Sequence, residues 1–275
     1  MTSAIGPGSS RVFRDDKNHP YTLGPEADAG YASAMQWFAS EAGQRLLAGE
    51  SEAMGKRLSD RFGYHLVQVG GLPGVDLLST SRILQRCVVD LTGTGVRHGH
   101  PSLRGRASAL PVETDVADVV VLPHVLEFEP RPHEALREAA RILRPEGHLF
   151  VSALNPWSLM GLWRLLRRHT GNPPWHGRFL AQGRLRDWLK LVGLELVSVD
   201  GFFFLPPLRN PRMLDRLSLL ESAGRRLWPP FNGAYLLSAR KRLSRATPVR
   251  ALFRYRPRLV GVSLAGPPAR VTDGD

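Results

Sequence analysis

The stretch ALPVETDVADVVVLPHVLEFEPRPHEALREAARILRPEGHLFVSALNP, residues 109–156, contains the pattern that decides the fold. Within it, DVVVLP (118–123) is a short and nearly continuous apolar run, which is typical of a strand buried on both faces. HEALREAARIL (133–143) has apolar residues at helical spacing, and the RPEG that follows ends this helix with a proline and a glycine. HLFVSAL (148–154) is the next apolar run. Strand, helix and strand in this order predict a parallel sheet covered by helices on both faces.

The same alternation continues in both directions from this stretch. One or two amphipathic helices are expected between residues 31 and 62, where apolar side chains stand among good helix formers. The segment 95–104 carries little strand signal. The remaining expected elements are a strand at 65–70 with a helix-like stretch up to about residue 85, a strand at 87–91, a helix at 183–192, a strand at 194–204, a helix near 211–226 and a last strand at 234–239.

Both ends of the chain differ in composition from its middle. Residues 1–30 are rich in Gly, Pro, Ser and charge, and we expect them to be disordered. Residues 240–275 hold nine Arg or Lys against two Asp, a net charge of 9 − 2 = +7, among several prolines. The folded domain should therefore span 31–243, followed by a basic, Pro-rich, disordered tail at 244–275. Such a tail either stays solvated or contacts RNA, DNA or anionic lipid.

The composition limits the class of protein. With 275 residues and 43% hydrophobic content, the chain can bury one substantial core. Its single cysteine, Cys87, excludes an internal disulfide framework and a cysteine-based zinc cluster, and no metal site is predicted. No run of apolar residues is long enough for a membrane span, and the first twenty residues do not resemble a signal peptide. A cytoplasmic protein is expected.

Candidate binding residues follow three of the expected strands. Gly70, Gly71 and Gly74 come after the first strand, and glycines allow a ligand to approach the backbone closely. Asp90 closes the next strand, where a carboxylate could accept hydrogen bonds from both hydroxyls of a ribose. The loop LPHVLEF (122–128) leaves the third strand. Because ligands of doubly wound sheets bind beyond the carboxyl ends of the strands, these features should converge on one nucleoside site.

The loop after the first strand favours one nucleoside cofactor over another. A dinucleotide site needs backbone N–H groups aimed at a pyrophosphate, but Pro73 removes one of them. The spacing of a dinucleotide motif would also need glycine where Val69 stands. S-adenosylmethionine has no phosphate, so a proline there costs it less, and the loop favours S-adenosylmethionine over NAD as the cofactor.

Residues 109–156 also resemble the central motif block of class I S-adenosylmethionine-dependent methyltransferases, in particular the group called type 11. The shared features are a Leu-Pro pair, a strand that begins Asp-x-Val, a His in the next loop, an Arg-x-Leu-x-Pro-x-Gly turn and a final strand that ends near Asn-Pro. In this chain they are Leu110–Pro111, Asp118–Val120, His124, Arg141–Gly147 and Asn155–Pro156. The resemblance implies a Rossmann-like, doubly wound, seven-stranded α/β sheet that is mostly parallel, with the last strand antiparallel.

The resemblance also implies roles for individual residues. Gly70, Gly71 and Gly74 would face the methionine and ribose of the cofactor, and Asp90 the ribose diol. Ala107, Leu110 and His124 would border the adenine, with a base as an alternative role for His124. No catalytic residue is assigned, because methyl acceptors differ across this fold and several members need no base.

The methyl acceptor would bind after the strand that ends at residue 154, where this family often inserts substrate-binding elements. Asn155 and Trp157 are therefore candidate substrate contacts. Residues 147–186 hold six Arg, three Trp and no Asp or Glu. Such a segment suits an anionic or planar acceptor, including a nucleic acid. Alternatively, SLMGLWRLLRRH is a helix that packs its Leu and Trp face and leaves its Arg residues in solvent.

Two motifs depart from the family pattern. Gln68 stands where the family has an acid, and Leu72 replaces the middle glycine of its first motif. Arg106 stands where the family often has an Asp that accepts a hydrogen bond from the adenine amino group, and an Arg has no acceptor. One such lost contact weakens binding by about 1–3 kcal/mol. Three functions follow as hypotheses: a methyltransferase with an unidentified acceptor, an inactive methyltransferase-fold protein that binds or regulates, and a nucleic-acid-binding protein that uses its basic segments.

Overall fold

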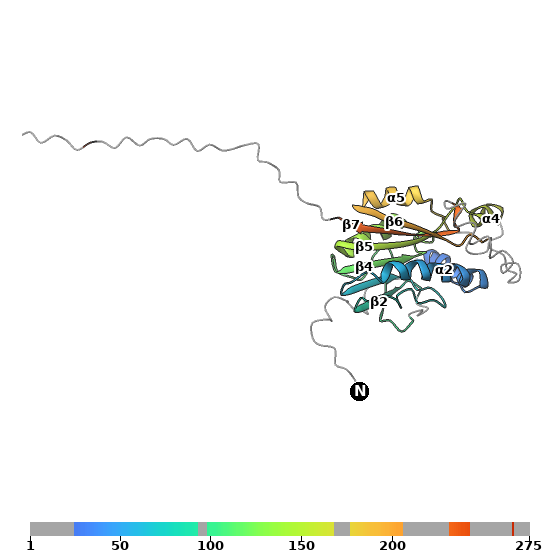
Figure 1. Cartoon of the computed structure of the whole chain (residues 1–275), viewed down its shortest axis with the longest axis horizontal. Helices are drawn as coiled ribbons and strands as arrows, with labels where there is room; N and C mark the ends of the chain where they lie inside the picture. Colours follow the sequence, from blue (N-terminus) through green and yellow to red (C-terminus); the bar gives the residue numbers. More distant parts are fainter. Residues whose placement is uncertain (1–24, 93–97, 168–176, 206–230, 243–265, 267–275) are drawn as a thin grey trace, which may run out of the picture. The chain divides into compact units, whose positions relative to one another are not determined.

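A computed structural model describes residues 25–92, 98–167, 177–205 and 231–242, together with Gly266 (Figure 1). The chain divides between Leu243 and Ser244 into two units, and only Gly266 of the second unit is described. The helix expected near 211–226 and nearly all of the basic tail therefore lie outside the described residues.

Seven strands form one sheet, in the order β3-β2-β1-β4-β5-β7-β6. The strands are β1 (His65–Val69), β2 (Gln85–Asp90), β3 (Ser102–Arg104), β4 (Ala117–Pro123), β5 (Leu143–Leu154), β6 (Leu194–Phe202) and β7 (Ala234–Lys241). β7 is antiparallel to β5 and β6, and every other neighbouring pair is parallel. The predicted α/β fold, with a seven-stranded sheet and an antiparallel last strand, is confirmed.

Helices cover both faces of this sheet. They are α1 (Pro25–Phe38), α2 (Glu41–Leu58), α3 (Pro132–Ile142), α4 (Leu159–Arg167) and α5 (Gln182–Leu191). Figure 1 shows α2 and α5 on opposite sides of the strands. Alternate residues of β4 belong to two separate apolar clusters, one with α3 and α5 and the other with α2. Among the described helices, none is long and apolar enough to cross a bilayer.

The helix-like stretch expected between the glycines and residue 85 was predicted wrongly. Residues 70–84 form turns instead. Asp76 Oδ1 accepts a hydrogen bond from the N–H of Leu78 at 2.9 Å, and Ser81 Oγ accepts one from the N–H of Ile83 at 3.2 Å. Short polar side chains that bond to nearby backbone N–H groups compete with helix formation. No helix N-terminus therefore stands behind the glycines in the described part of the chain.

Three other elements differ from the expectation. The segment with little strand signal contains β3, which pairs with β2 at the edge of the sheet. β5 begins at Leu143 and includes the RPEG turn, where the pairing with β4 shifts register and Glu146 has a φ of 66°. α1 begins at Pro25, inside the segment that was expected to be disordered, whose first 24 residues are not described.

Candidate functional site

The glycine turn, residues 70–74, follows β1 at the carboxyl edge of the sheet. Gly70 and Gly74 have φ angles of 83° and 76°, in the left-handed region that favours glycine. The N–H of Gly70 donates a hydrogen bond to the carbonyl oxygen of Val89 at 2.8 Å. This bond ties the turn to the end of β2, so the structure places Gly70 next to the strand that ends at Asp90.

The backbone carbonyls of the turn are held by side chains of the protein itself. Gln68 replaces the acid of the family motif, and its amide donates within the turn. The partners are Gln68 Nε2 to Gly70 O at 2.7 Å, Tyr31 Oη to Gly71 O at 3.4 Å, His98 Nε2 with Leu72 O at 2.8 Å, and Gln44 Nε2 to Pro73 O at 2.9 Å. These contacts fix the turn through residues that the motif pattern does not include.

Tyr31, from α1, covers the glycine turn. Its side chain is buried, and a Cβ atom added at Gly70 would collide with its hydroxyl oxygen. Burial raises the pKa of Tyr31, and the charges of Glu50, Glu127 and Asp90 raise it further, so the hydroxyl stays neutral. Tyr31 thus occupies the space through which a ligand would approach Gly70.

Asp90 lies at the carboxyl end of β2 and is 8% exposed. Its Oδ1 accepts a hydrogen bond from the N–H of Thr92 at 3.0 Å, which starts a turn after the strand. Its carbonyl oxygen accepts one from the N–H of Gly105 at 3.2 Å. The carboxylate therefore shapes the local turn, and it lies at the sheet edge where a ribose contact was expected.

The segment expected to border the adenine runs from Gly105 to Leu110. Ala107 and Leu110 are buried, and Arg106 is partly buried in an isolated bridge to Ala109. The N–H of Leu110 donates to Glu138 Oε2 at 3.0 Å. Glu138 is thereby a structural residue that anchors this segment to α3.

His124 follows β4 directly and is the centre of a buried ionic cluster. Its φ of 51° is unusual for a residue other than glycine. Nδ1 lies 2.9 Å from Glu127 Oε1, and Nε2 lies 3.4 Å from Glu50 Oε2 on α2. All three side chains are nearly inaccessible to solvent. The structure thus places His124 between two carboxylates, and its contact with adenine stays a prediction.

The protonation of His124 follows from these neighbours. Burial by itself lowers the pKa of a histidine, but the negative charges of Glu50 and Glu127 and their hydrogen bonds outweigh it and raise the pKa of His124 to about 10. The imidazole is therefore a cation at neutral pH. A protonated imidazole cannot accept a proton, so His124 is poorly suited to the alternative role of a base.

Sequence reasoning missed Tyr31, Glu50 and Glu127. The sequence could have indicated Glu127, because it stands three residues after His124 in the loop that was named as a candidate binding element. Its Oε1 also accepts a hydrogen bond from the N–H of Leu154 at 2.8 Å, which joins the ends of β4 and β5. Tyr31 and Glu50 lie on helices far away in the sequence. Of these two, only Glu50 could have been indicated, by the helical spacing that buries it with its apolar neighbours.

The two candidate substrate contacts, Asn155 and Trp157, take different positions. Asn155 is buried, and its Nδ2 donates to Asn232 Oδ1 at 3.2 Å. Its Oδ1 accepts from the N–H of Trp157 at 3.1 Å, which shapes the entry to α4. Trp157 is 71% exposed. The structure therefore shows a structural role for Asn155 and an accessible ring at Trp157, while contact with a substrate stays a prediction for both.

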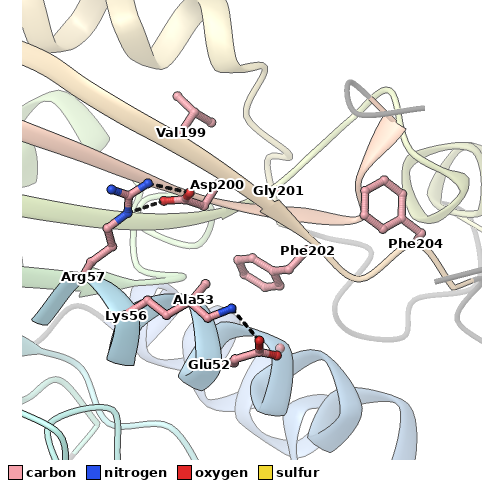
Figure 2. A pocket seen from close by; sticks show the side chains of 10 residues that line it. Glu52, Ala53, Lys56, Arg57, Val199, Asp200, Gly201, Phe202 and Phe204 are labelled. Atoms are coloured by element: carbon pink, nitrogen blue, oxygen red, sulfur yellow. Dashed lines mark hydrogen bonds and ion pairs between the residues drawn. The ribbon is translucent and has the colours of Figure 1, made fainter. Parts of the chain in front are cut away.

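A separate hollow of about 410 Å³ lies between α2 and β6. Figure 2 shows Arg57 and Asp200 joined across it by a two-pronged ion pair, with N···O distances of 2.7 Å. Phe202 and Phe204 also line it. Since β6 is the edge strand farthest from β3, this hollow is distinct from the glycine turn.

Residues 78–151 match the sequence model of the methyltransferase domain family. The Escherichia coli protein YafS is 31% identical over 145 residues, which are 53% of this chain and 58% of YafS. A ubiquinone biosynthesis O-methyltransferase of Xanthomonas oryzae is 31% identical over 113 residues, 38% of this chain and 46% of that protein. The chain thus spans about half the length of these curated relatives.

Solved structures agree on the fold. An S-adenosylmethionine-dependent methyltransferase of Thermotoga maritima superposes with a TM-score of 0.58 at 18% identity, over 78% of this chain and 98% of that one. A methyltransferase of Haloferax volcanii, in complex with the activator Trm112, gives 0.58 at 18% identity, over 79% and 98%. The chain thus has the fold of the class I methyltransferases, and residues 78–151 are similar to the methyltransferase domain family. S-adenosylmethionine, the cofactor expected from the sequence, is also the one named for the Thermotoga maritima protein.

The residues at the sheet edge fit the chemistry of this cofactor, which carries a ribose diol, a sulfonium and an ammonium group. Asp90 offers a carboxylate for the diol. Glu50 Oε1 and Glu127 Oε2 are buried and accept no hydrogen bond from any described residue, and their negative charge suits the cationic groups. Tyr31 must leave the glycine turn before a ligand can reach Gly70. No cluster of metal-binding side chains occurs among the described residues.

Proposed function

We propose that this chain binds S-adenosylmethionine at the carboxyl edge of β1, β2 and β4 and transfers its methyl group to an acceptor. The observation that carries the proposal is that three strand ends meet at this edge: Gly70 is bonded to the end of β2 beside Asp90, and the buried cluster of His124, Glu50 and Glu127 follows β4. Three carboxyl groups, those of Asp90, Glu50 and Glu127, stand at this edge against the one imidazolium of His124. A negative centre in a poorly solvated site favours a cationic ligand over a neutral one.

In this mechanism the described residues bind and orient. When bound, the cofactor supplies a methyl group that its positively charged sulfur activates for in-line displacement. Asp90 would accept hydrogen bonds from the ribose hydroxyls, and Gly70 would allow close approach of the cofactor once Tyr31 has moved away. Glu50 and Glu127 would offer negative charge to the cationic groups of the cofactor. His124 holds these two carboxylates in place, and orientation supplies much of the rate.

The proposal extends only to the chemical class of the methyl acceptor. Several relatives are named ubiquinone biosynthesis O-methyltransferase, so a hydroxyl group on a ring is the acceptor that we propose to test first. Contact of the basic tail with nucleic acid stays a prediction, because the tail is almost wholly outside the described residues.

Changing Asp90 to Asn tests the cofactor site. Asparagine keeps an oxygen for the N–H of Thr92 but loses the charge that holds the ribose hydroxyls. We expect the affinity for S-adenosylmethionine to fall by about tenfold to a hundredfold, the equivalent of one lost charged hydrogen bond. Isothermal titration calorimetry with S-adenosylmethionine and with S-adenosylhomocysteine measures it. Asp187→Asn, at an exposed position of α5, is the matched control and should bind like the parent.

A second candidate function is an inactive binding protein of the same fold. It is favoured by the position of Tyr31 over Gly70 and by the four turn carbonyls that already have partners. The same titration separates the two candidates. Absence of heat from the unmodified chain at millimolar ligand would support the inactive protein, whereas binding that Asp90→Asn weakens would remove it.

A further inference from the structure

Exposed apolar side chains gather around α4. Trp157, Leu159, Leu162 and Leu165 are exposed by 71%, 49%, 56% and 59%, and we call them the leucine face. The three leucines are spaced by three residues, so they lie on one side of the helix. Met160 is fully buried and Trp163 packs against the core. α4 therefore has apolar side chains on its inner side and, in addition, an outer apolar stripe that is exposed among the described residues.

The sequence that contains the leucine face carries charge of one sign. Residues 147–186 contain no Asp or Glu and six arginines. Arg164 stands over the ring of Phe179 at 5.2 Å, and Arg178 is exposed. A short helix that combines leucine, tryptophan and arginine without acids is typical of segments that lie in the plane of a membrane interface. Tryptophan is itself enriched at the level of the lipid headgroups.

This chemistry favours a lipid surface over a nucleic acid. A nucleic acid would be bound by the arginines and by ring stacking, and it offers nothing to three exposed leucines. An anionic bilayer attracts the arginines through its headgroups and takes up the leucines below them. Only the lipid surface uses both properties of the segment.

The leucine face and the candidate site share one edge of the sheet. β5 ends at Leu154 and α4 begins at Leu159, so the face lies at the carboxyl edge of the sheet, the edge that also carries the glycine turn. We propose that the leucine face docks this protein on the surface of an anionic bilayer. The candidate site then opens close to the lipid phase, where an apolar acceptor is concentrated. The docking is independent of cofactor binding and of turnover.

Sedimentation with vesicles tests the proposal on the full chain without cofactor. The unmodified protein should bind vesicles of phosphatidylglycerol and phosphatidylcholine and bind phosphatidylcholine vesicles much more weakly. The triple variant L159S/L162S/L165S should lower the partition coefficient by about tenfold or more, because the outer apolar stripe is lost. Leu84→Ser with Leu191→Ser is the matched control, since these leucines are 75% and 81% exposed away from α4. This control should bind like the parent, and thermal unfolding checks that all variants are folded.

A second set of variants separates the leucine face from the basic tail. Arg250, Arg254, Arg256 and Arg258 are changed together to Gln in the full chain. If these changes abolish vesicle binding while L159S/L162S/L165S binds normally, the tail is responsible and the proposal is overturned. It is equally overturned if the protein binds no vesicles, or if it binds a single-stranded RNA probe instead of them.

Discussion

Changing His124 to Gln should lower the free energy of unfolding by about 3–5 kcal/mol, the usual effect of removing one partner from a buried ionic group. His124 is the cation between Glu50 and Glu127, with its ring nitrogens 3.4 Å and 2.9 Å from their carboxylates. A neutral amide leaves two negative charges facing each other in a site that water does not reach. Unfolding in guanidinium chloride, followed by circular dichroism, measures the loss.

The pH dependence gives this prediction a second readout. The pKa of His124 is raised to about 10 in the folded protein, from about 6.5 in the unfolded chain. The folded state therefore keeps a proton that the unfolded state releases. The resulting stabilisation is fully present below about pH 6.5, decreases above it and is lost as the pH rises through about 10. The difference in stability between the parent and His124→Gln should shrink steadily between pH 7 and pH 10.

A histidine of opposite character provides the control. His148 on β5 is partly buried, and burial together with the charges of Arg61 and Arg240 lowers its pKa to about 4. It is neutral at pH 7, so His148→Gln removes no cation and should cost far less stability. In the His124→Gln background, Glu50→Gln with Glu127→Gln should recover part of the loss. Equal losses for the two histidines, or no recovery, would contradict the ionic explanation.

The sheet could be predicted well from the sequence because local patterns determine most of its strands and helices. In β4 and β5 the apolar runs are nearly continuous, and α3 between them has clear helical spacing. The edge strand β3 was missed because it has three residues and only one partner, so neither face needs a buried pattern. The turns after β1 were mistaken for a helix because hydrogen bonds from Asp76 and Ser81, which decide their form, override weak apolar spacing.

The candidate site was predicted only in part, for a related reason. Gly70 and Asp90 follow strands, and the rule that ligands bind at the carboxyl edge brings them together without any knowledge of packing. Tyr31 and Glu50 reach the same edge from α1 and α2, and no local pattern connects these helices to the ends of β1 and β4. The role of His124 depends on Glu50, so its charge could not be derived from the loop in which it stands.

The missing glycine of the first motif leads to the second large effect, which is expected from Leu72→Gly. By motif alone, this change restores a cofactor contact. In the structure Leu72 is fully buried in the apolar cluster that includes Leu46 and Phe38 of the covering helices. Truncating a buried leucine costs about 2–5 kcal/mol for the lost side chain and the cavity it leaves.

The restored glycine should therefore hollow the core and leave the affinity for S-adenosylmethionine no higher than in the parent. Leu72 points its side chain into the core, while Tyr31, which covers Gly70, is unchanged by this substitution. Guanidinium unfolding and calorimetric titration of the same variant measure both quantities, with Leu84→Gly at an exposed position as the control for added backbone freedom. A variant as stable as its parent that binds the cofactor more tightly would show that Leu72, and not Tyr31, limits access to the glycine turn.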